Sequence, residues 1–299
     1  MSQDEILDCL VIGGGAAGLT AAVYLGRYRR RALVLDAGGS RLAKIPRTRN
    51  VPGFPEGIEG PELLRRMQEH ARIYGVPTTH TEVRRIEKLE DGSFRAESDR
   101  GQWRARFVLL ATGARDVEPE IDGLHEAMQA GQVRFCPVCD GFETQGQRVA
   151  VLGRAGHGLH ESLFISGFGN EVTWLAMATQ EEVDPRELAR LRDAGVRLAD
   201  SPPHRIDCGV DCGVRVALQD GQVLEFDTLY PALGLHHACD LATRLGARSC
   251  PDGQLEVDVH QQTTVDGLYA AGDVAMDLNQ ISVAAGHAAI ASTAIHNRL

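Results

Sequence analysis

Two cysteines near the middle of the chain have the spacing of a redox-active pair. They are Cys136 and Cys139, and the run continues with Asp140 and Gly141. Cysteines separated by two residues can close into a disulfide, which carries two electrons. The chain also begins with a glycine-rich loop over residues 13–18, a pattern typical of dinucleotide binding. A dithiol together with a dinucleotide cofactor that exchanges two electrons suggests a flavin-linked disulfide enzyme.

The length and composition favour an ordinary globular protein of two domains. The chain has 299 residues, of which 43% are hydrophobic and 24% are charged. Its net charge of −10 argues against nucleic acid or an anionic membrane as a partner, because both attract a basic face. No apolar run is long enough to span a bilayer, and the acidic N-terminus is unlike a signal peptide. We therefore expect no membrane partner and a cytoplasmic location.

The remaining cysteines do not suggest a structural disulfide framework. The chain has seven cysteines, an odd number, and Cys9 lies in an apolar run that belongs in a core. A zinc site built from Cys136, Cys139, Cys208 and Cys212 is an alternative. However, the second pair is spaced one residue further apart than in a usual zinc knuckle. A redox role for Cys136 and Cys139 is therefore favoured.

Strand–helix–strand units occur twice along the chain. Residues 7–13 form an apolar run ending in glycine, which predicts a buried parallel strand. A helix over residues 16–29 and a strand over residues 32–35 should follow. The same order returns over residues 148–175, with its first glycine 140 positions after Gly13. This internal repeat predicts two dinucleotide-fold units.

The last part of the chain returns to the first domain. Residues 268–273 predict a strand that ends in Gly-Asp, and a helix should follow from residue 281. We therefore expect an α/β fold with two dinucleotide-binding, Rossmann-like domains, the second inserted into the first. The split first domain should cover residues 1–115 and 242–299, and the inserted domain residues 116–241.

Three glycines of the first loop have the full dinucleotide spacing. Gly13 allows a tight turn, Gly15 lets the backbone approach a pyrophosphate, and Gly18 allows close packing of the helix on the strand. The N-terminus of the helix that begins near Ala16 should face the phosphate charge. Asp36 lies 23 positions after Gly13, at the end of the second strand, where it can accept hydrogen bonds from a ribose. These residues predict a dinucleotide site.

Two other corners extend this site. Thr112-Gly113 and Gly272-Asp273 each end a predicted strand in a glycine turn. Both corners could converge on a long ligand, and an aspartate at such a corner can bind a ribityl chain. The alternative is that both are ordinary turns.

The order of the motifs is more specific than any one of them. The motifs are Gly13-x-Gly-x-x-Gly18, Asn50-Val51-Pro52-Gly53, Ala111-Thr112-Gly113, Cys136-x-x-Cys139-Asp140-Gly141, a second glycine loop at residue 153, and Ala271-Gly272-Asp273 with Gln280. This order resembles the low-molecular-weight thioredoxin reductases across essentially the whole chain. The resemblance implies FAD in the first domain, an active-site disulfide in the inserted domain, and a homodimer.

The resemblance also implies a role for each site residue. Cys139 should lie against the flavin and exchange electrons with it, and Cys136 should attack a partner disulfide. Asp140 should protonate the leaving thiolate, with a helix cap as its alternative role. The residues expected to bind FAD are Gly13, Gly15, Ala16, Gly18, Asp36, Asn50, Thr112, Gly113, Gly272, Asp273, Gln280 and Ile281.

Chemistry supports those roles independently. Thiol–disulfide exchange needs a thiolate, and a cysteine pair at a helix start can have one thiol with a lowered pKa. A carboxyl group beside the pair can move the proton that each half-reaction requires.

The second glycine loop, residues 153–158, departs from the family pattern. Its middle position is Ala155, whose methyl group projects where a pyrophosphate would have to approach the backbone. The position that matches Asp36 of the first loop is Ala176. An acid that could serve an NAD ribose is therefore missing, since Glu181 and Glu182 come too late.

The residues after that second strand also differ from those of NADPH-using relatives. Such relatives carry a His-Arg-Arg type stretch there, because a 2′-phosphate needs cationic partners. This chain has Ala176, Met177 and Ala178 instead. Losing two or three charge-assisted contacts of roughly 1.5–3 kcal/mol each should strongly weaken the binding of NADPH. We therefore predict poor or absent NADPH binding.

The function predicted from the sequence is an FAD-dependent thiol–disulfide oxidoreductase. Its disulfide substrate would be a thioredoxin-like protein or a small dithiol, and its electron donor or acceptor would be ferredoxin or oxygen. The alternatives are an ordinary NADPH-dependent thioredoxin reductase and a non-catalytic, flavin-bound redox sensor. His236 and His237 are expected in a surface loop, and His287 on a helix surface or at a dimer contact.

Overall fold

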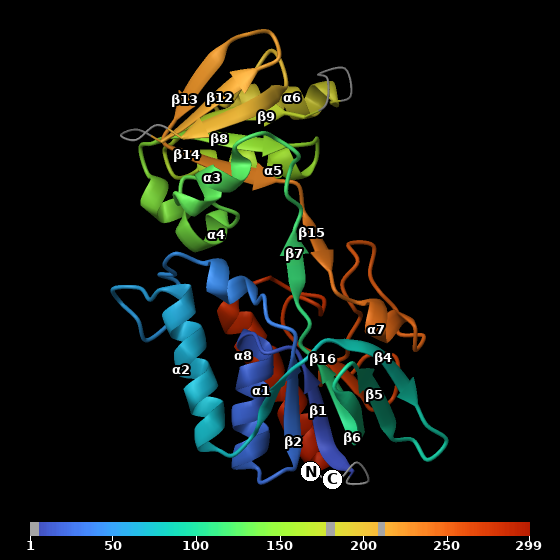
Figure 1. Cartoon of the computed structure of the whole chain (residues 1–299). Helices are drawn as coiled ribbons and strands as arrows, with labels where there is room; N and C mark the ends of the chain where they lie inside the picture. The colour runs from blue at the N-terminus through green and yellow to red at the C-terminus, as the bar shows by residue number, and fades with distance from the viewer. Residues whose placement is uncertain (1–5, 178–182, 209–212) are drawn as a thin grey trace. The chain divides into compact units, whose positions relative to one another are not determined.

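A computed structural model describes residues 6–177, 183–208 and 213–299. The chain divides into two compact units (Figure 1). Unit 1 comprises Met1–Arg115 and His236–Leu299, and unit 2 comprises Asp116–Leu235. Within the described ranges, no helix combines the length and the apolar character that a membrane crossing requires.

Unit 1 is built on one seven-stranded sheet, in which β1 lies between β2 and β6 and pairs with both in parallel. The strand order is β3-β2-β1-β6-β5-β4, and β16 pairs with β6, also in parallel. The pairs β4–β5 and β5–β6 are antiparallel. The strands are β1 (Leu7–Ile12), β2 (Ala32–Asp36), β3 (Thr78–His80), β4 (Val83–Lys88), β5 (Phe94–Ser98), β6 (Gly101–Leu110) and β16 (Leu268–Ala270).

Helices α1, α2 and α8 belong to unit 1, and α1 packs against both of the others. Apolar residues of α1 and α8 form one core cluster with alternate residues of β1, β2 and β6. Two of the arginines at and just after the end of α1 make contacts within the unit: Arg30 donates to the His296 ring and Arg27 donates to the Tyr74 hydroxyl. The helices of this unit are α1 (Ala16–Arg27), the 3₁₀ helix η1 (Arg41–Lys44), α2 (Gly60–Ile73), α7 (Asp240–Thr243) and α8 (Ile281–Asn297).

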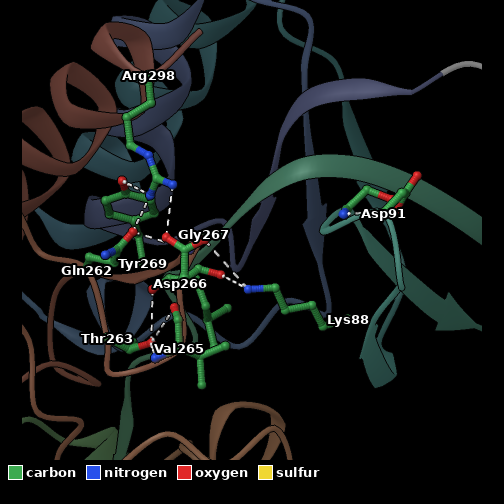
Figure 2. Close-up of polar contacts among 11 residues, drawn as sticks. Lys88, Asp91, Gln262, Thr263, Val265, Asp266, Gly267, Tyr269 and Arg298 are labelled. Carbon is green, nitrogen blue, oxygen red and sulfur yellow. Dashed lines mark hydrogen bonds and ion pairs between the residues drawn. The ribbon is translucent and has the colours of Figure 1, made fainter.

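A polar network fastens the end of α8 to the loop before β16 (Figure 2). Arg298 donates to the Gln262 side chain, to Asp266 Oδ1 at 2.9 Å and to the Tyr269 hydroxyl at 3.3 Å. Lys88 of β4 donates to the Asp266 carbonyl at 2.6 Å. The network joins the C-terminal helix to the sheet that carries the first glycine loop.

Unit 2 has two sheets. The first is parallel, in the order β10-β9-β8-β14, and the second is antiparallel, in the order β11-β12-β13. The strands are β8 (Arg148–Gly153), β9 (Glu171–Ala176), β10 (Arg197–Leu198), β11 (Pro203–Cys208), β12 (Val214–Leu218), β13 (Val223–Phe226) and β14 (Thr228–Ala232). The helices are α3 (Leu124–Gln129), α4 (Pro137–Asp140), the 3₁₀ helix η2 (Gly141–Thr144), α5 (His157–Ser166) and α6 (Pro185–Asp193).

Two short strands, β7 (Ala114–Asp116) and β15 (Leu235–His237), form a separate sheet where the chain passes between the units. The predicted α/β class with parallel strand–helix–strand units is confirmed. Cys9 is fully buried in β1, as its apolar neighbours predict, and burial raises its pKa well above the ordinary value. Cys208 is the last residue of strand β11.

Candidate functional site

Four parallel strands of unit 1 end at the same level. In the pairing register, Ile12 of β1 lies beside Leu35 of β2 and Leu110 of β6, and Leu110 lies beside Ala270 of β16. Each strand is followed at once by a predicted site segment, so the four segments share the carboxyl edge of the sheet. Ligands of open α/β sheets bind at this edge.

The glycines of the first loop are required by close contacts. Gly13 has φ +109°, and a Cβ there would lie 2.1 Å from the Ala111 carbonyl oxygen. A Cβ on Gly18 would lie 1.9 Å from the Gly13 carbonyl oxygen. A Cβ on Gly15, by contrast, would meet only Ser40 Oγ within 4 Å among the described residues beyond its chain neighbours, at 3.2 Å. Gly13 and Gly18 therefore serve backbone packing, whereas Gly15 leaves open space at the N-terminus of α1.

Asp36 is attached to the loop that it was predicted to serve. Its Oδ1 accepts hydrogen bonds from the Gly14 amide at 3.0 Å and from the Gly38 amide at 3.1 Å. Among the described residues, both donors to this carboxylate end on Oδ1. The second oxygen can accept from a ribose hydroxyl.

The Gly-Asp corner after β16 packs against the first loop. A Cβ on Gly272, which has φ +76°, would lie 3.0 Å from the Ala17 methyl group. Arg41 of η1 forms an ion pair with Asp273 Oδ2 at 2.7 Å. The His237 ring lies 2.6 Å from the Asp273 carbonyl oxygen. The sequence did not indicate either of these partners of Asp273.

The other predicted FAD residues lie at the start of α8 and in the turn after β6. Asn50 donates from its side-chain nitrogen to Gln280 Oε1 at 2.8 Å, and Gln280 directly precedes Ile281, the first residue of α8. Thr112 donates from its hydroxyl to the Ala238 carbonyl at 2.8 Å. Gly113 has φ +69°, so its turn favours glycine.

These features fit FAD. The open space at Gly15 suits a pyrophosphate, the second oxygen of Asp36 suits a ribose, and Asp273 offers a carboxylate at the same edge. The N-terminus of α1 supplies backbone amides for the phosphate charge. When bound, FAD supplies a group that takes or gives two electrons.

In unit 2, a disulfide joins Cys136 and Cys139, with their Cα atoms 5.3 Å apart. Cys136 is the N-cap of α4, a helix of four residues, and its carbonyl accepts from the Cys139 amide at 2.9 Å. One helical turn therefore holds both sulfur atoms together. The zinc alternative is not supported, because the first two proposed ligands are bonded to each other and Cys212 lies outside the described residues.

Asp140 does not cap a helix with its side chain. Its Oδ1 accepts a hydrogen bond from the Tyr230 hydroxyl at 2.7 Å, and its Oδ2 lies 3.5 Å from Arg134 Nη1. Burial raises the pKa of Asp140, whereas the Tyr230 hydrogen bond and the Arg134 charge lower it. The net shift is upward. A carboxyl that holds a proton more readily than usual therefore directly follows Cys139.

Apolar side chains are exposed around the disulfide. Val138 lies between the two cysteines and is 49% exposed, and Phe142 of η2 is 74% exposed. Phe164 of α5 is also exposed and packs edge-on against Phe168, whose ring lies beneath Gly141. Exposed aromatic side chains beside a reactive group are typical of a protein contact.

The second glycine loop is closely packed at Gly158. A Cβ on Gly158 would lie 2.4 Å from Trp174 Nε1, which donates to the Gly153 carbonyl at 3.1 Å. Ala155 is half-buried against the same apolar cluster as Trp174. Ala176 is buried at the end of β9. Ala178, Glu181 and Glu182 lie outside the described residues.

The expected surface position of His287 is wrong. The side chain of His287 is buried in α8, its Nε2 lies 3.4 Å from Asp277 Oδ2, and its Nδ1 has no partner among the described residues. The helix is rich in small residues on several faces, so its sequence does not mark which face is covered. His236 is exposed as expected, but half-buried His237 contacts the backbone of Asp273.

Comparisons with known proteins agree with this arrangement. Residues 7–288 match the family described as pyridine nucleotide-disulphide oxidoreductase. The chain is 27% identical over 310 residues to a thioredoxin reductase of Bacillus subtilis (strain 168), an alignment that covers 99% of this chain and 96% of the relative.

Solved structures agree as well. The thioredoxin reductase of Streptococcus pyogenes MGAS5005 matches with a TM-score of 0.89 and 27% identity, over 98% of this chain and 97% of that one. The crystal structure of HlmI matches with a TM-score of 0.92 and 26% identity, over 100% of this chain and 94% of that one. The predicted resemblance, the Rossmann-like fold and the assignment as an enzyme are confirmed. The chain belongs to the pyridine nucleotide-disulphide oxidoreductase family and is a thioredoxin reductase-like flavin disulfide oxidoreductase.

Proposed function

We propose that the protein passes electrons between FAD and the disulfide of a thioredoxin-like protein or of a small molecule, through Cys136 and Cys139. The observation that carries this proposal is the disulfide itself, closed within one helical turn and followed by the half-buried carboxyl of Asp140. Cys136 would attack the partner, Cys139 would exchange electrons with FAD, and Asp140 would protonate the departing thiolate. FAD would be held in unit 1 by the twelve residues named above.

A protein partner is supported by the surface around the disulfide. Val138 and Phe142 together offer an apolar contact on both sides of Cys139. A small dithiol would need no such contact. Replacing Phe142 with Ser should therefore raise KM for a thioredoxin-like substrate and leave the reaction with dithiothreitol unchanged. Equal effects on both substrates would speak for a small-molecule substrate.

For the electron donor or acceptor, we propose ferredoxin or oxygen rather than NADPH. The support is Ala155 at the pyrophosphate position and Ala176 with Met177 at the position of the 2′-phosphate contacts. Ordinary NADPH-dependent thioredoxin reduction is the second candidate, because the Bacillus and Streptococcus relatives are both named thioredoxin reductase. We also propose a homodimer, the assembly that the family resemblance implies.

Anaerobic titration of the purified flavoprotein tests both parts of the proposal. Dithiothreitol should bleach the oxidised-flavin absorption of the wild type quickly, and that of a C136S/C139S variant only slowly. NADPH should bleach neither protein quickly. Rapid bleaching of the wild type by NADPH would favour the second candidate.

A turnover assay separates catalysis from a sensor without turnover. Dithionite-reduced enzyme with excess oxidised thioredoxin should produce several equivalents of dithiol per flavin when dithionite is supplied slowly. One equivalent and no more would favour the sensor. Equal bleaching of the wild type and of C136S/C139S by dithiothreitol would contradict any role of the disulfide.

A further inference from the structure

The carboxylate of Asp140 is held by donors from two different parts of unit 2. Tyr230 of β14 donates to Oδ1 at 2.7 Å, and the Arg134 guanidinium lies 3.5 Å from Oδ2. Tyr230 is 90 positions from Asp140 in the sequence. Both carboxylate oxygens are therefore engaged by groups that do not belong to the Cys-x-x-Cys motif.

The sheet fixes the positions of both donors. The segment before the disulfide runs beside β14, since the Arg134 amide donates to the Leu229 carbonyl at 2.9 Å and the Leu229 amide donates to the Gln132 carbonyl at 3.0 Å. Tyr230 follows Leu229 and is fully buried, while β14 itself pairs with β8. Because the backbones at residues 134 and 229 are hydrogen-bonded to each other, the side chains of Arg134 and Tyr230 are both held close to Asp140.

Tyr230 acts toward Asp140 as a donor. Burial, followed by the charge and the hydrogen bond of Asp140, raises the pKa of Tyr230 far above its ordinary value, so its hydroxyl keeps its proton. A donor to a carboxylate favours the charged form of that carboxylate. Burial favours the neutral form, and in Asp140 burial is the larger effect. The two donors therefore keep the upward shift of the Asp140 pKa smaller than burial alone would make it.

We propose that Tyr230 and Arg134 are positioning residues that orient Asp140 toward the Cys136–Cys139 pair and set the pH range in which the disulfide exchanges rapidly. The proposal rests on the proposed role of Asp140 as the acid. In the step concerned, an external thiolate attacks one sulfur, the Cys136–Cys139 bond breaks, and Asp140 gives its proton to the departing sulfur. A second thiolate of the same reductant then attacks the reductant's own sulfur in the mixed disulfide and releases the remaining cysteine as a thiolate. The reductant thereby loses two electrons and the cysteine pair gains them.

Other titratable groups lie on the elements packed against α4. Glu143 of η2 raises the pKa of Asp140 by its charge. Helix α5 carries His157, His160 and Glu161. Burial raises the pKa of Glu161 to about 7. A Glu161→Gln variant is therefore the matched control for any change in the pH profile.

The sign of the expected effect follows from the donor role. The neutral form of Asp140 is the active acid, so the rate constant per attacking thiolate falls as pH rises through the pKa of Asp140. Tyr230→Phe removes a donor to the charged form and raises this pKa. The part of the pH–rate profile in which the rate constant falls, here called the falling limb, should move to higher pH by about one to two units, given the strength of hydrogen bonds to charged groups. Arg134→Gln should move it in the same direction by less, because Arg134 is partly exposed.

The experiment measures the disulfide directly. Oxidised holoprotein is reduced with dithiothreitol from pH 5 to 9, quenched in acid at set times, and labelled with maleimide, and the Cys136–Cys139 peptide is measured by mass spectrometry. Tyr230→Phe keeps the buried ring, and its urea unfolding midpoint is recorded beside the profile. Arg134→Gln, at a partly exposed position, serves as the second variant if Tyr230→Phe folds poorly.

The outcomes separate this proposal from the proposed function. A falling limb at higher pH in Tyr230→Phe and Arg134→Gln, with no change in Glu161→Gln, supports the proposal. Unchanged limbs in both variants would overturn it and leave Tyr230 a structural residue. A limb that persists in Asp140→Asn would overturn the acid role itself. The proposed function fails by a different measurement, equal flavin bleaching of the wild type and C136S/C139S.

Discussion

The first glycine-rich loop has all the glycines of the dinucleotide motif, whereas the second has only its first and last glycine. Gly13 and Gly18 of the first loop correspond in spacing to Gly153 and Gly158 of the second. In both loops these positions face close neighbours: a Cβ on Gly18 would lie 1.9 Å from a backbone oxygen, and a Cβ on Gly158 would lie 2.4 Å from Trp174 Nε1. The glycines that pack strand on helix are therefore present twice.

The positions that face a ligand are present only once. The open space at Gly15 is replaced by the half-buried methyl group of Ala155, and the carboxylate of Asp36 is replaced by buried Ala176. A fold needs its packing glycines whether or not a cofactor binds, whereas no close backbone contact requires the glycine at the middle position. The second loop therefore has the residues that pack the strand against the helix in unit 2. We propose that it no longer binds a nucleotide.

The largest effect should come from a packing glycine of the first loop. Gly18→Ala places a Cβ against the Gly13 carbonyl oxygen, which cannot rotate away. We expect a loss of about 3 kcal/mol or more in the free energy of unfolding, at the upper end of overpacking costs. Urea unfolding followed by circular dichroism measures it.

The control for this variant is Gly286→Ala in α8. Outside its own helical turn, no heavy atom of the described residues lies within 4 Å of a Cβ at Gly286, so the substitution should leave stability unchanged or raise it by roughly 0.5–1 kcal/mol through helix propensity. If Gly18→Ala unfolds at the same urea concentration as Gly286→Ala, the packing account of the shared glycines is wrong.

The next effect concerns the ligand-facing glycine. Gly15→Ala gives the first loop the methyl group that the second loop already has, and only Ser40 Oγ must adjust. Stability without cofactor should change little, while the affinity for FAD should fall about 10- to 100-fold as one or two charge-assisted amide contacts are lost. Quenching of flavin fluorescence on titration of the apoprotein gives the Kd.

Ala155→Gly is the matching control, because it alters the corresponding position of unit 2. It should leave the Kd for FAD unchanged. Wild-type affinity in Gly15→Ala would show that FAD does not approach the backbone at this loop.

Local sequence patterns predicted most of this framework. The apolar runs that end in Gly13 and Gly153, and the acid at Asp36, depend on residues close together in the chain, so spacing alone places them. Partners joined across the fold were missed. Arg41 meets Asp273 across 232 positions, and no local pattern marks that approach.

The same reason explains the other residues that the sequence did not reveal. Tyr230 belongs to an apolar strand, so the sequence suggests only that its ring packs in the core. Its hydroxyl reaches Asp140 because β14 runs beside residue 134, and this pairing is visible only in the structure. His287 was misplaced because a helix of small residues has no clear apolar stripe. Burial and long-range polar contacts follow from tertiary packing, which spacing does not encode.

Two substitutions in unit 2 should increase the affinity for NADPH. Ala155→Gly with Met177→Arg restores open space at the second loop and one cation for a 2′-phosphate. The double variant should bind NADPH about tenfold more tightly than the wild type, the lower value for one charge-assisted contact. Isothermal titration of the oxidised protein measures the change.

NADH provides the control, because it lacks the 2′-phosphate and should gain less from Met177→Arg. Micromolar affinity of the wild type for NADPH would contradict the proposal that the second loop has lost its site.

The smallest effect should come from the charge of Asp36. Asp36→Asn keeps an oxygen that can accept from the Gly14 and Gly38 amides, but it replaces the free carboxylate oxygen with an amide that donates. The affinity for FAD should fall about fivefold, the equivalent of one net hydrogen bond of about 1 kcal/mol. Asp258 is a matched control, since its Oδ1 also accepts two backbone amides, from His260 and Gln262. Asp258→Asn should not change the Kd for FAD, and an equal loss in both variants would mean that Asp36 acts only by holding its own turn.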